Sequence, residues 1–168
     1  MSDAPFELLG TPQKGGLLII GDHASNRVPD DIDLGLDPSL LGAHIAWDIG
    51  VAAVARLMTQ DDAFAAFLGA YSRLVVDLNR DEHDTAAIPA ESDGLAIPGN
   101  ALSPIEKEAR LERFHRPYHG HLQQLLSQHR PTLILSLHSY TPALQRKPNE
   151  ARPWEVGVLY NAQETAST

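Results

Sequence analysis

Two histidines each follow a short apolar run, and this repeated arrangement is the strongest chemical signal in the sequence. The run LLIIGD leads to His23, and the run LILSL leads to His138. Short continuous apolar runs predict strands buried on both faces, as in a parallel sheet. Ligands of open α/β sheets lie at the carboxyl ends of the strands, so two imidazoles delivered there can share a metal ion. For each histidine taken alone, the alternative is a structural hydrogen bond at a strand end.

A catalytic zinc site typically has three protein ligands and an open position for water, so the two histidines need a third donor. The sequence contains no cysteine, which leaves His, Asp, Glu or Asn. The candidates are Asp22, Asp48 and, as a neutral oxygen donor, Asn26. Asp22 adjoins His23, so on an extended strand its side chain points to the opposite face. Asp48 lies in an apolar stretch, where a buried acid is costly unless it is paired or binds a cation; an exposed helical position is the alternative.

A second polar cluster surrounds the apolar segment at residues 73–77. Arg73 precedes it, Asp77 ends it, and Asn79 and Arg80 follow. Arginine offers a planar fork that holds a carboxylate through two hydrogen bonds. We therefore expect a site for an anionic substrate here, with Asp77 holding one of the arginines. An ordinary surface ion pair is the alternative.

His115 and His119 are four residues apart and share one face of a predicted helix. Arg116 and Pro117 stand between them, where a metalloprotease helix has a glutamate. We expect the pair to lie behind the metal or on the substrate side, with direct metal binding as the less favoured alternative. Pro117 predicts a kink in the helix.

The remaining pattern predicts the elements that position these residues. Strands are predicted at residues 16–22, 63–70, 73–77, 132–137 and 154–160. A helical segment is predicted at 37–60, starting at Asp37-Pro38, and two glycines favour its division into two helices. A second helix is predicted at 103–128, with Ser103 as N-cap and Glu106 completing a capping box. Residues 79–100 predict a long loop and 162–168 an unstructured end. The order implies an α/β fold with a mostly parallel sheet and helices on its faces.

Composition bounds the class of protein. The 168 residues predict one domain, and 43% hydrophobic and 21% charged residues are ordinary for a globular chain. The net charge of -9 argues against a nucleic-acid or anionic-membrane partner. The sequence shows neither a signal peptide nor a long apolar span, so a cytoplasmic location is the expectation.

Six short motifs together resemble the N-formylglutamate amidohydrolases and, more distantly, the zinc carboxypeptidase and aspartoacylase group. They are GDHASNRVP (21–29), WDIG (47–50), YSR (71–73), DLNR (77–80), HRPYH (115–119) and LHSY (137–140). They occur in the family order and span about residues 15–160. Each motif is weak alone, but the set is specific.

The resemblance implies a three-layer α/β/α sandwich of the zinc-peptidase type (phosphorylase/hydrolase-like). It also implies a zinc-dependent hydrolase that cleaves the amide of an N-acyl amino acid such as N-formyl-L-glutamate, with a place in histidine degradation. His23 and His138 match the first and last zinc-binding histidines. Arg73, Asn79 and Arg80 match positions that bind the substrate carboxylate.

The sequence departs from the carboxypeptidase pattern at two points. The position of a metal-binding glutamate is taken by Asn26, which we assign with His119 to the substrate, leaving Asp48 as the third metal ligand. The family also continues past the end of this chain, where it has a late general base, so we expect residues 1–168 to form one domain lacking its C-terminal third. The base is unidentified, and Glu91 in the long loop is the only candidate.

Two functions follow as hypotheses. The first is zinc-dependent hydrolysis of a small anionic amide. The alternative is a truncated, non-catalytic homologue that binds a small carboxylate or a metal. A shortened sheet also exposes an apolar edge, so we expect self-association into a homo-oligomer.

Overall fold

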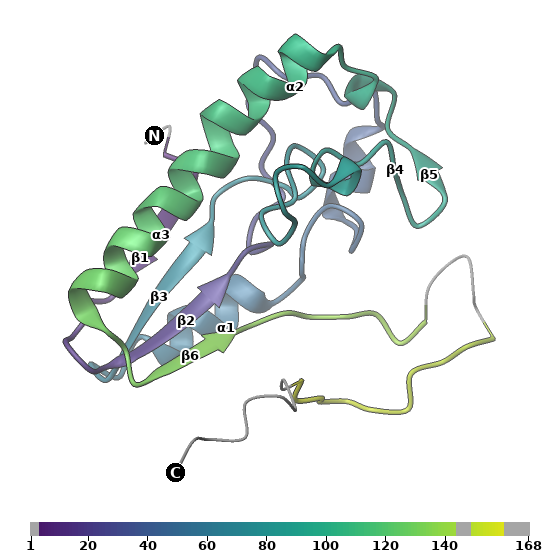
Figure 1. Cartoon of the computed structure of the whole chain (residues 1–168). Helices are drawn as coiled ribbons and strands as arrows, with labels where there is room; N and C mark the ends of the chain where they lie inside the picture. The colour runs from purple at the N-terminus through teal and green to yellow at the C-terminus, as the bar shows by residue number, and fades with distance from the viewer. Residues whose placement is uncertain (1–3, 144–148, 160–168) are drawn as a thin grey trace.

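The computed structural model describes residues 4–143 and 149–159. Their fold is mixed α/β (Figure 1). The strands are β1 (Phe6–Leu9), β2 (Leu17–Gly21), β3 (Phe64–Gly69), β4 (Glu91–Ser92), β5 (Leu95–Ala96) and β6 (Leu133–Ser136). The helices are η1 (Pro38–Gly42), α1 (Val51–Met58), η2 (Thr85–Ala87), η3 (Pro98–Asn100), α2 (Pro104–Arg110), η4 (Leu111–His115) and α3 (Arg116–His129).

The main sheet has four strands in the order β1-β3-β2-β6. β2 runs parallel to both neighbours and pairs Leu17 with Phe64 of β3 and with Leu133 of β6. β1 is antiparallel to β3; it was not predicted, because its sequence FELL neither alternates between apolar and polar residues nor forms a continuous apolar run. The predicted mostly parallel sheet is confirmed. Its three parallel strands end at the same edge, where the histidines follow β2 and β6.

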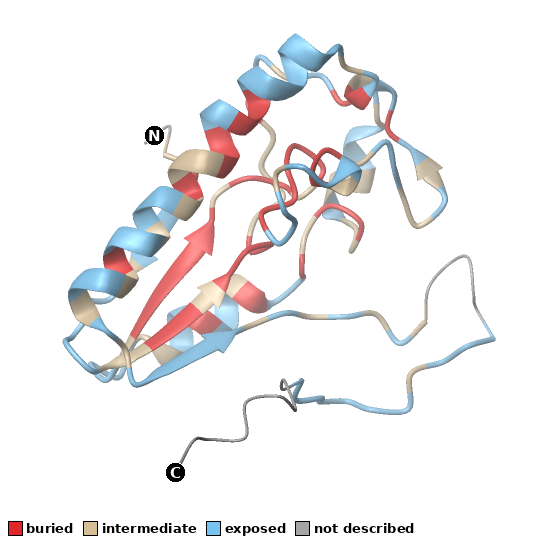
Figure 2. Ribbon diagram, viewed as in Figure 1, coloured by how far each residue is buried: buried red, intermediate tan, exposed pale blue. Residues whose placement is uncertain are grey.

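The central strands β2 and β3 are buried on both faces, as continuous apolar strands require. On one face, Leu18 and Phe67 belong to a core cluster with Phe114 and Tyr118 of the η4–α3 segment. On the other face, Ile19 and its neighbours pack against α1, which contributes two buried residues. Figure 2 shows buried colour along β2 and β3 and a long, partly exposed α3 beside them. The strand period of two therefore sends successive side chains to different helices.

The prediction of helix across residues 37–60 is only partly right. Asp37 caps η1 through Ser39, with Pro38 at the first helical position, and α1 occupies the last part of the segment. Residues 43–50 form turns instead. The amide of Asp48 donates to the carbonyl of His23 over 2.8 Å, and Gly50 takes a left-handed conformation with φ of 90°. The amide of Asp48 therefore makes a long-range backbone hydrogen bond in place of the hydrogen bond it would make within a helix. This long-range bond places Asp48 beside His23.

The predicted strand at residues 73–77 is wrong, because this apolar segment forms buried turns. The Ser72 hydroxyl accepts from the amide of Leu74 and donates to the carbonyl of Ala46. Leu74 and Val75 are fully buried. The apolar residues of this segment are buried because it crosses the core, and apolar character alone does not distinguish a buried turn from a buried strand.

Residues 79–100 form the predicted long loop, in which no helix or strand exceeds three residues. The helix predicted at 103–128 is confirmed with its capping box at Ser103 and Glu106. It contains the π-helical segment η4 just before Pro117, a wider turn of the kind that accompanies helix irregularities. Arg130 ends α3 in a left-handed conformation. No helix of the described ranges is long and apolar enough to cross a membrane.

The predicted strand at 154–160 does not form over residues 154–159; Tyr160 and the predicted unstructured end at 162–168 lie outside the described residues. Trp154 is 68% exposed and Val156 is 82% exposed. A strand is stabilised by pairing with a neighbour, and residues 154–159 have no strand partner in the described part of the chain.

β6 presents an open, apolar sheet edge. Leu133, Ile134 and Leu135 are all exposed, and β2 is the strand that pairs with β6. Such edges template pairing with a second chain, and a lysine on the edge opposes this pairing.

We expect the wild-type chain to have a mass above the 18.3 kDa of the monomer by light scattering, and we expect Ile134→Lys to restore the monomer. Leu57→Lys, at an exposed position of α1, is the matched control. A monomeric wild type contradicts the prediction.

Candidate metal centre and adjoining cleft

The two strand-end histidines meet at one edge of the sheet. His23 follows β2 and His138 follows β6, and their ring centroids are 5.4 Å apart. Parallel pairing of the two strands places their carboxyl ends side by side. The structure thus brings together the two residues that the sequence singled out.

Asp48 joins the two histidines, as predicted. Its Oδ2 lies 2.9 Å from His138 Nδ1 and 3.7 Å from His23 Nδ1. One ligand atom from each of the three residues lies within 4.8 Å of the others. His23 and Asp48 are buried, while the His138 side chain is 34% exposed. Two nitrogens and one carboxylate oxygen are a donor set suited to zinc.

A buried nitrogen without a partner supports a cation at this position. His23 Nε2 lies 2.7 Å from Oδ1 of the buried Asp77. A carboxylate can only accept, so Nε2–H is the donor, and in the neutral ring Nδ1 carries the lone pair. Nδ1 is buried and has no hydrogen-bond partner. Metal-binding histidines show this arrangement, in which a carboxylate fixes the tautomer and the other nitrogen faces the metal.

Asp77 therefore has a role that sequence reasoning missed. It was expected to hold an arginine, and its Oδ2 does lie 2.7 Å from Arg73 Nη2. Its contact with His23 spans 54 residues of sequence, and nothing in the local pattern indicates it. The only available signal was a carboxylate directly after an apolar segment.

The electrostatics of the three buried groups favour charged carboxylates. Burial alone raises the pKa of Asp48, but the neighbouring imidazoles of His138 and His23 outweigh it and hold the pKa well below its usual range. Burial likewise opposes ionisation of Asp77, yet His23 and Arg73 lower its pKa to about 2. Burial lowers the pKa of His23, but the neighbouring carboxylates of Asp48 and Asp77 give a net rise. The centre thus attracts a positive charge, which a proton or a metal ion can supply.

Asp22, the other acidic candidate, lies outside the converging ligand set. Its Oδ1 accepts a 2.7 Å hydrogen bond from the Tyr118 hydroxyl in the core. Its Oδ2 is 4.0 Å from His138 Nε2, on the ring edge away from the Asp48 contact. Burial, together with the adjacent carboxylate, raises the pKa of Tyr118. Tyr118 therefore stays a neutral donor that fixes Asp22.

The predicted substrate residues are divided between the cleft and its surroundings. Arg73 lies in the cleft, with Nη1 3.7 Å from Asp48. Asn79 and Arg80 are exposed and do not line the cleft. Asn26 donates its amide to the carbonyl of Leu41. Glu91 is exposed on β4, also outside the cleft lining. The roles of these last four residues remain predictions.

His115 and His119 support the backbone next to Asp77. His119 Nε2 lies 3.0 Å from the carbonyl of Leu78, and His115 Nε2 lies 2.8 Å from that of Arg80. Each bond uses the imidazole as donor to a carbonyl. Burial, and then the neighbouring His115, lower the pKa of His119, so the ring is held neutral. The pair holds the backbone that follows Asp77, and the predicted role of His119 at the substrate stays a prediction.

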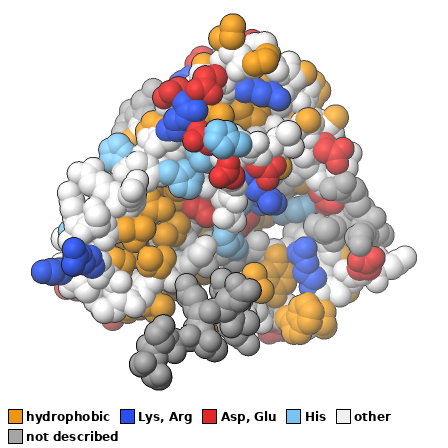
Figure 3. Space-filling view, viewed as in Figure 1, with side chains coloured by type: hydrophobic (Ala, Val, Ile, Leu, Met, Phe, Trp, Pro, Cys, Tyr) orange, Lys and Arg blue, Asp and Glu red, His pale blue; other side chains and the backbone are white. Residues whose placement is uncertain are grey.

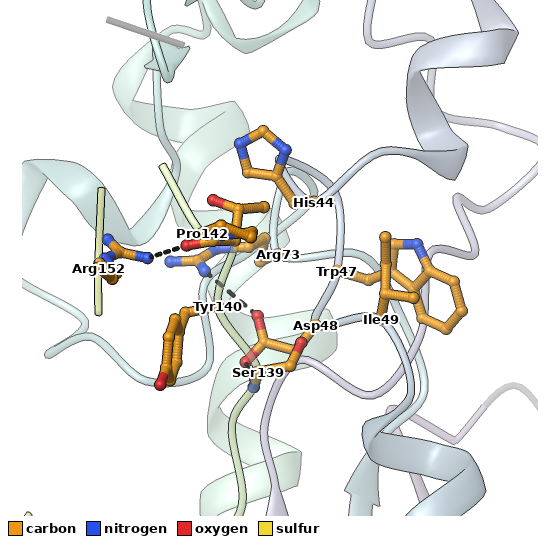
Figure 4. A pocket seen from close by; sticks show the side chains of 10 residues that line it. His44, Trp47, Asp48, Ile49, Arg73, Ser139, Tyr140, Pro142 and Arg152 are labelled. Carbon is orange, nitrogen blue, oxygen red and sulfur yellow. Dashed lines mark hydrogen bonds and ion pairs between the residues drawn. The ribbon is translucent and has the colours of Figure 1, made fainter. Parts of the chain in front are cut away.

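A cleft of about 460 Å³ opens beside Asp48. Its size is typical of small-molecule sites. It is lined by His44, Trp47, Asp48, Ile49, Arg73, Ser139, Tyr140, Thr141, Pro142 and Arg152 (Figure 4). Figure 3 shows histidine, acidic and basic side chains gathered on one face. Sequence reasoning missed His44 and Arg152, because neither follows a strand end nor lies in a recognisable motif.

Comparisons with known proteins converge on one family. Residues 15–168 match the family model described as N-formylglutamate amidohydrolase. The crystal structure of a gene product from Agrobacterium tumefaciens is similar, with a TM-score of 0.80 and 30% identity over 86% of this chain. An N-formylglutamate amidohydrolase from Ralstonia eutropha shares the fold, with a TM-score of 0.66 and 22% identity over 82% of this chain. The matches cover 60% and 58% of those two chains. No curated protein matches the sequence.

Proposed function

Because this chain belongs to the N-formylglutamate amidohydrolase family, we propose that it is a metal-dependent hydrolase acting on N-acyl amino acids such as N-formyl-L-glutamate. One observation carries the metal part of the proposal. His23, Asp48 and His138 converge within 4.8 Å, and the buried Nδ1 of His23 has no hydrogen-bond partner. Zinc is the metal that this donor set favours. We also propose a three-layer α/β/α sandwich of the zinc-peptidase type, since α3 packs on one face of the sheet and α1 on the other.

Two residues of the chain orient the metal ligand His23. Asp77 fixes the His23 ring so that Nδ1 faces the centre, and Arg73 holds Asp77 in place. Arg73 also borders the cleft, where its guanidinium can orient the amide or a carboxylate of the substrate. A zinc ion at this position supplies Lewis acidity, polarising a carbonyl and acidifying water. Removal of the water proton falls to a carboxylate base, for which Glu91 is a proposal from sequence alone.

The test measures metal content and formate release on the same protein. We expect the purified wild type to contain stoichiometric zinc by elemental analysis and to release formate from N-formyl-L-glutamate. Dialysis against a chelator is expected to remove both, and added zinc to restore them. Metal-free protein with unchanged formate release contradicts the proposal. Bound zinc without formate release supports the binding-only alternative instead.

A further inference from the structure

The cleft contains two arginines whose charges are balanced very differently. Arg73 has Nη2 2.7 Å from Asp77 and Nη1 3.7 Å from Asp48. Two carboxylates therefore already offset its positive charge. Arg152 lines the same cleft, and within residues 4–143 and 149–159 no carboxylate forms an ion pair with it.

The contacts of Arg152 hold its side chain without neutralising it. Nη1 donates to the carbonyl of Thr141 over 3.0 Å, and the guanidinium carbon lies 5.4 Å from the Tyr140 ring centroid. The backbone amide of Arg152 donates to the carbonyl of Pro142 over 2.7 Å. Figure 4 shows the side chain extending toward the part of the cleft where Arg73 lies. Of the five guanidinium donors, Nη1 alone provides a hydrogen bond to a described residue, which leaves the others to a ligand.

We propose that Arg152 binds the side-chain carboxylate of the substrate and thereby selects N-acylated acidic amino acids over neutral ones. The inference rests on the proposed function and assigns a specificity-determining residue to the same site. The chain carries a net charge of -9, so its overall field opposes an anionic ligand. A local cation without a carboxylate partner allows an anionic ligand to bind despite this field, and the two N–H groups of a guanidinium match the two oxygens of a carboxylate.

The experiment compares N-formyl-L-glutamate with N-formyl-L-glutamine, in which a neutral amide of similar shape replaces the side-chain carboxylate. Selectivity is the ratio of kcat/KM values where formate is released, and the ratio of Kd values by titration calorimetry where it is not. A failure of the proposed catalysis is thus separate from a failure of this inference. We expect the wild type to favour the glutamate ligand by about ten- to hundredfold, the range for a charge-assisted hydrogen bond.

Three variants sharpen the comparison. Arg152→Gln is expected to bring the ratio close to one, while Arg152→Lys retains part of it because the charge stays and the fork is lost. Arg56→Gln, on the exposed surface of α1 and outside the cleft, is expected to keep the wild-type ratio. Unchanged selectivity in Arg152→Gln overturns the proposal. An equal loss of affinity or kcat/KM for both ligands also overturns it, because Arg152 would then bind the α-carboxylate that the two ligands share. A wild type without preference between the two ligands overturns it as well.

Discussion

Replacement of His23 by alanine is expected to abolish both zinc binding and amide hydrolysis. His23 contributes one of three converging ligand atoms, and its buried Nδ1 has no hydrogen-bond partner. With His23 removed, only Asp48 and the partly exposed His138 remain, short of the three protein ligands of a catalytic zinc site. Zinc per chain by elemental analysis and formate released per minute are the measurements.

Two further variants separate the metal role from a structural one. His83→Ala removes an exposed histidine outside the cleft and is expected to leave zinc content unchanged. Asp77→Asn keeps the shape next to His23 but removes the charge, so zinc affinity is expected to fall about 10- to 100-fold, as for other carboxylates that orient metal ligands. Full zinc content in His23→Ala, with the fold retained by circular dichroism, would contradict the assignment of this centre.

Phe67→Ala is expected to produce the largest loss of stability. Phe67 is 1% exposed on the central strand β3. Its ring stacks on that of Phe6, with the ring centroids 4.7 Å apart, and packs against the ring of Tyr118, with the centroids 4.9 Å apart. Truncating a fully buried phenylalanine removes its transfer free energy and leaves a cavity, at a cost of about 3–5 kcal/mol. The measurement is the free energy of unfolding from urea denaturation.

Leu57→Ala is the matched control, because Leu57 is 65% exposed on α1. Surface truncations of this kind change stability by about 0.5 kcal/mol or less. Equal effects of the two substitutions would mean that the cluster around Phe67 is not the core that stabilises the sheet. Both variants should retain their zinc at temperatures below unfolding, since neither residue contacts the metal centre.

The sequence predicted secondary structure best where the pattern of neighbouring residues is enough to specify the element. β2, β3 and β6 are continuous apolar runs, and each was placed to within a few residues. The Ser103 capping box marked the start of α2 correctly, because that signal lies wholly in neighbouring residues. The failures, at residues 43–50, 73–77 and 154–159, are segments whose hydrogen-bond partners are distant or missing from the described chain.

What the sequence determined by itself was the identity of the chemical groups and the strand ends that deliver them. His23 and His138 follow apolar runs that form parallel strands of one sheet, although β6 is exposed rather than buried on both faces as predicted. Tertiary structure alone decided how the site closes. Asp48 reaches His138 across 90 residues, and Asp77 reaches His23 across 54. The physical reason is that both acids stand in turns fixed by long-range hydrogen bonds and core packing, which no local propensity encodes.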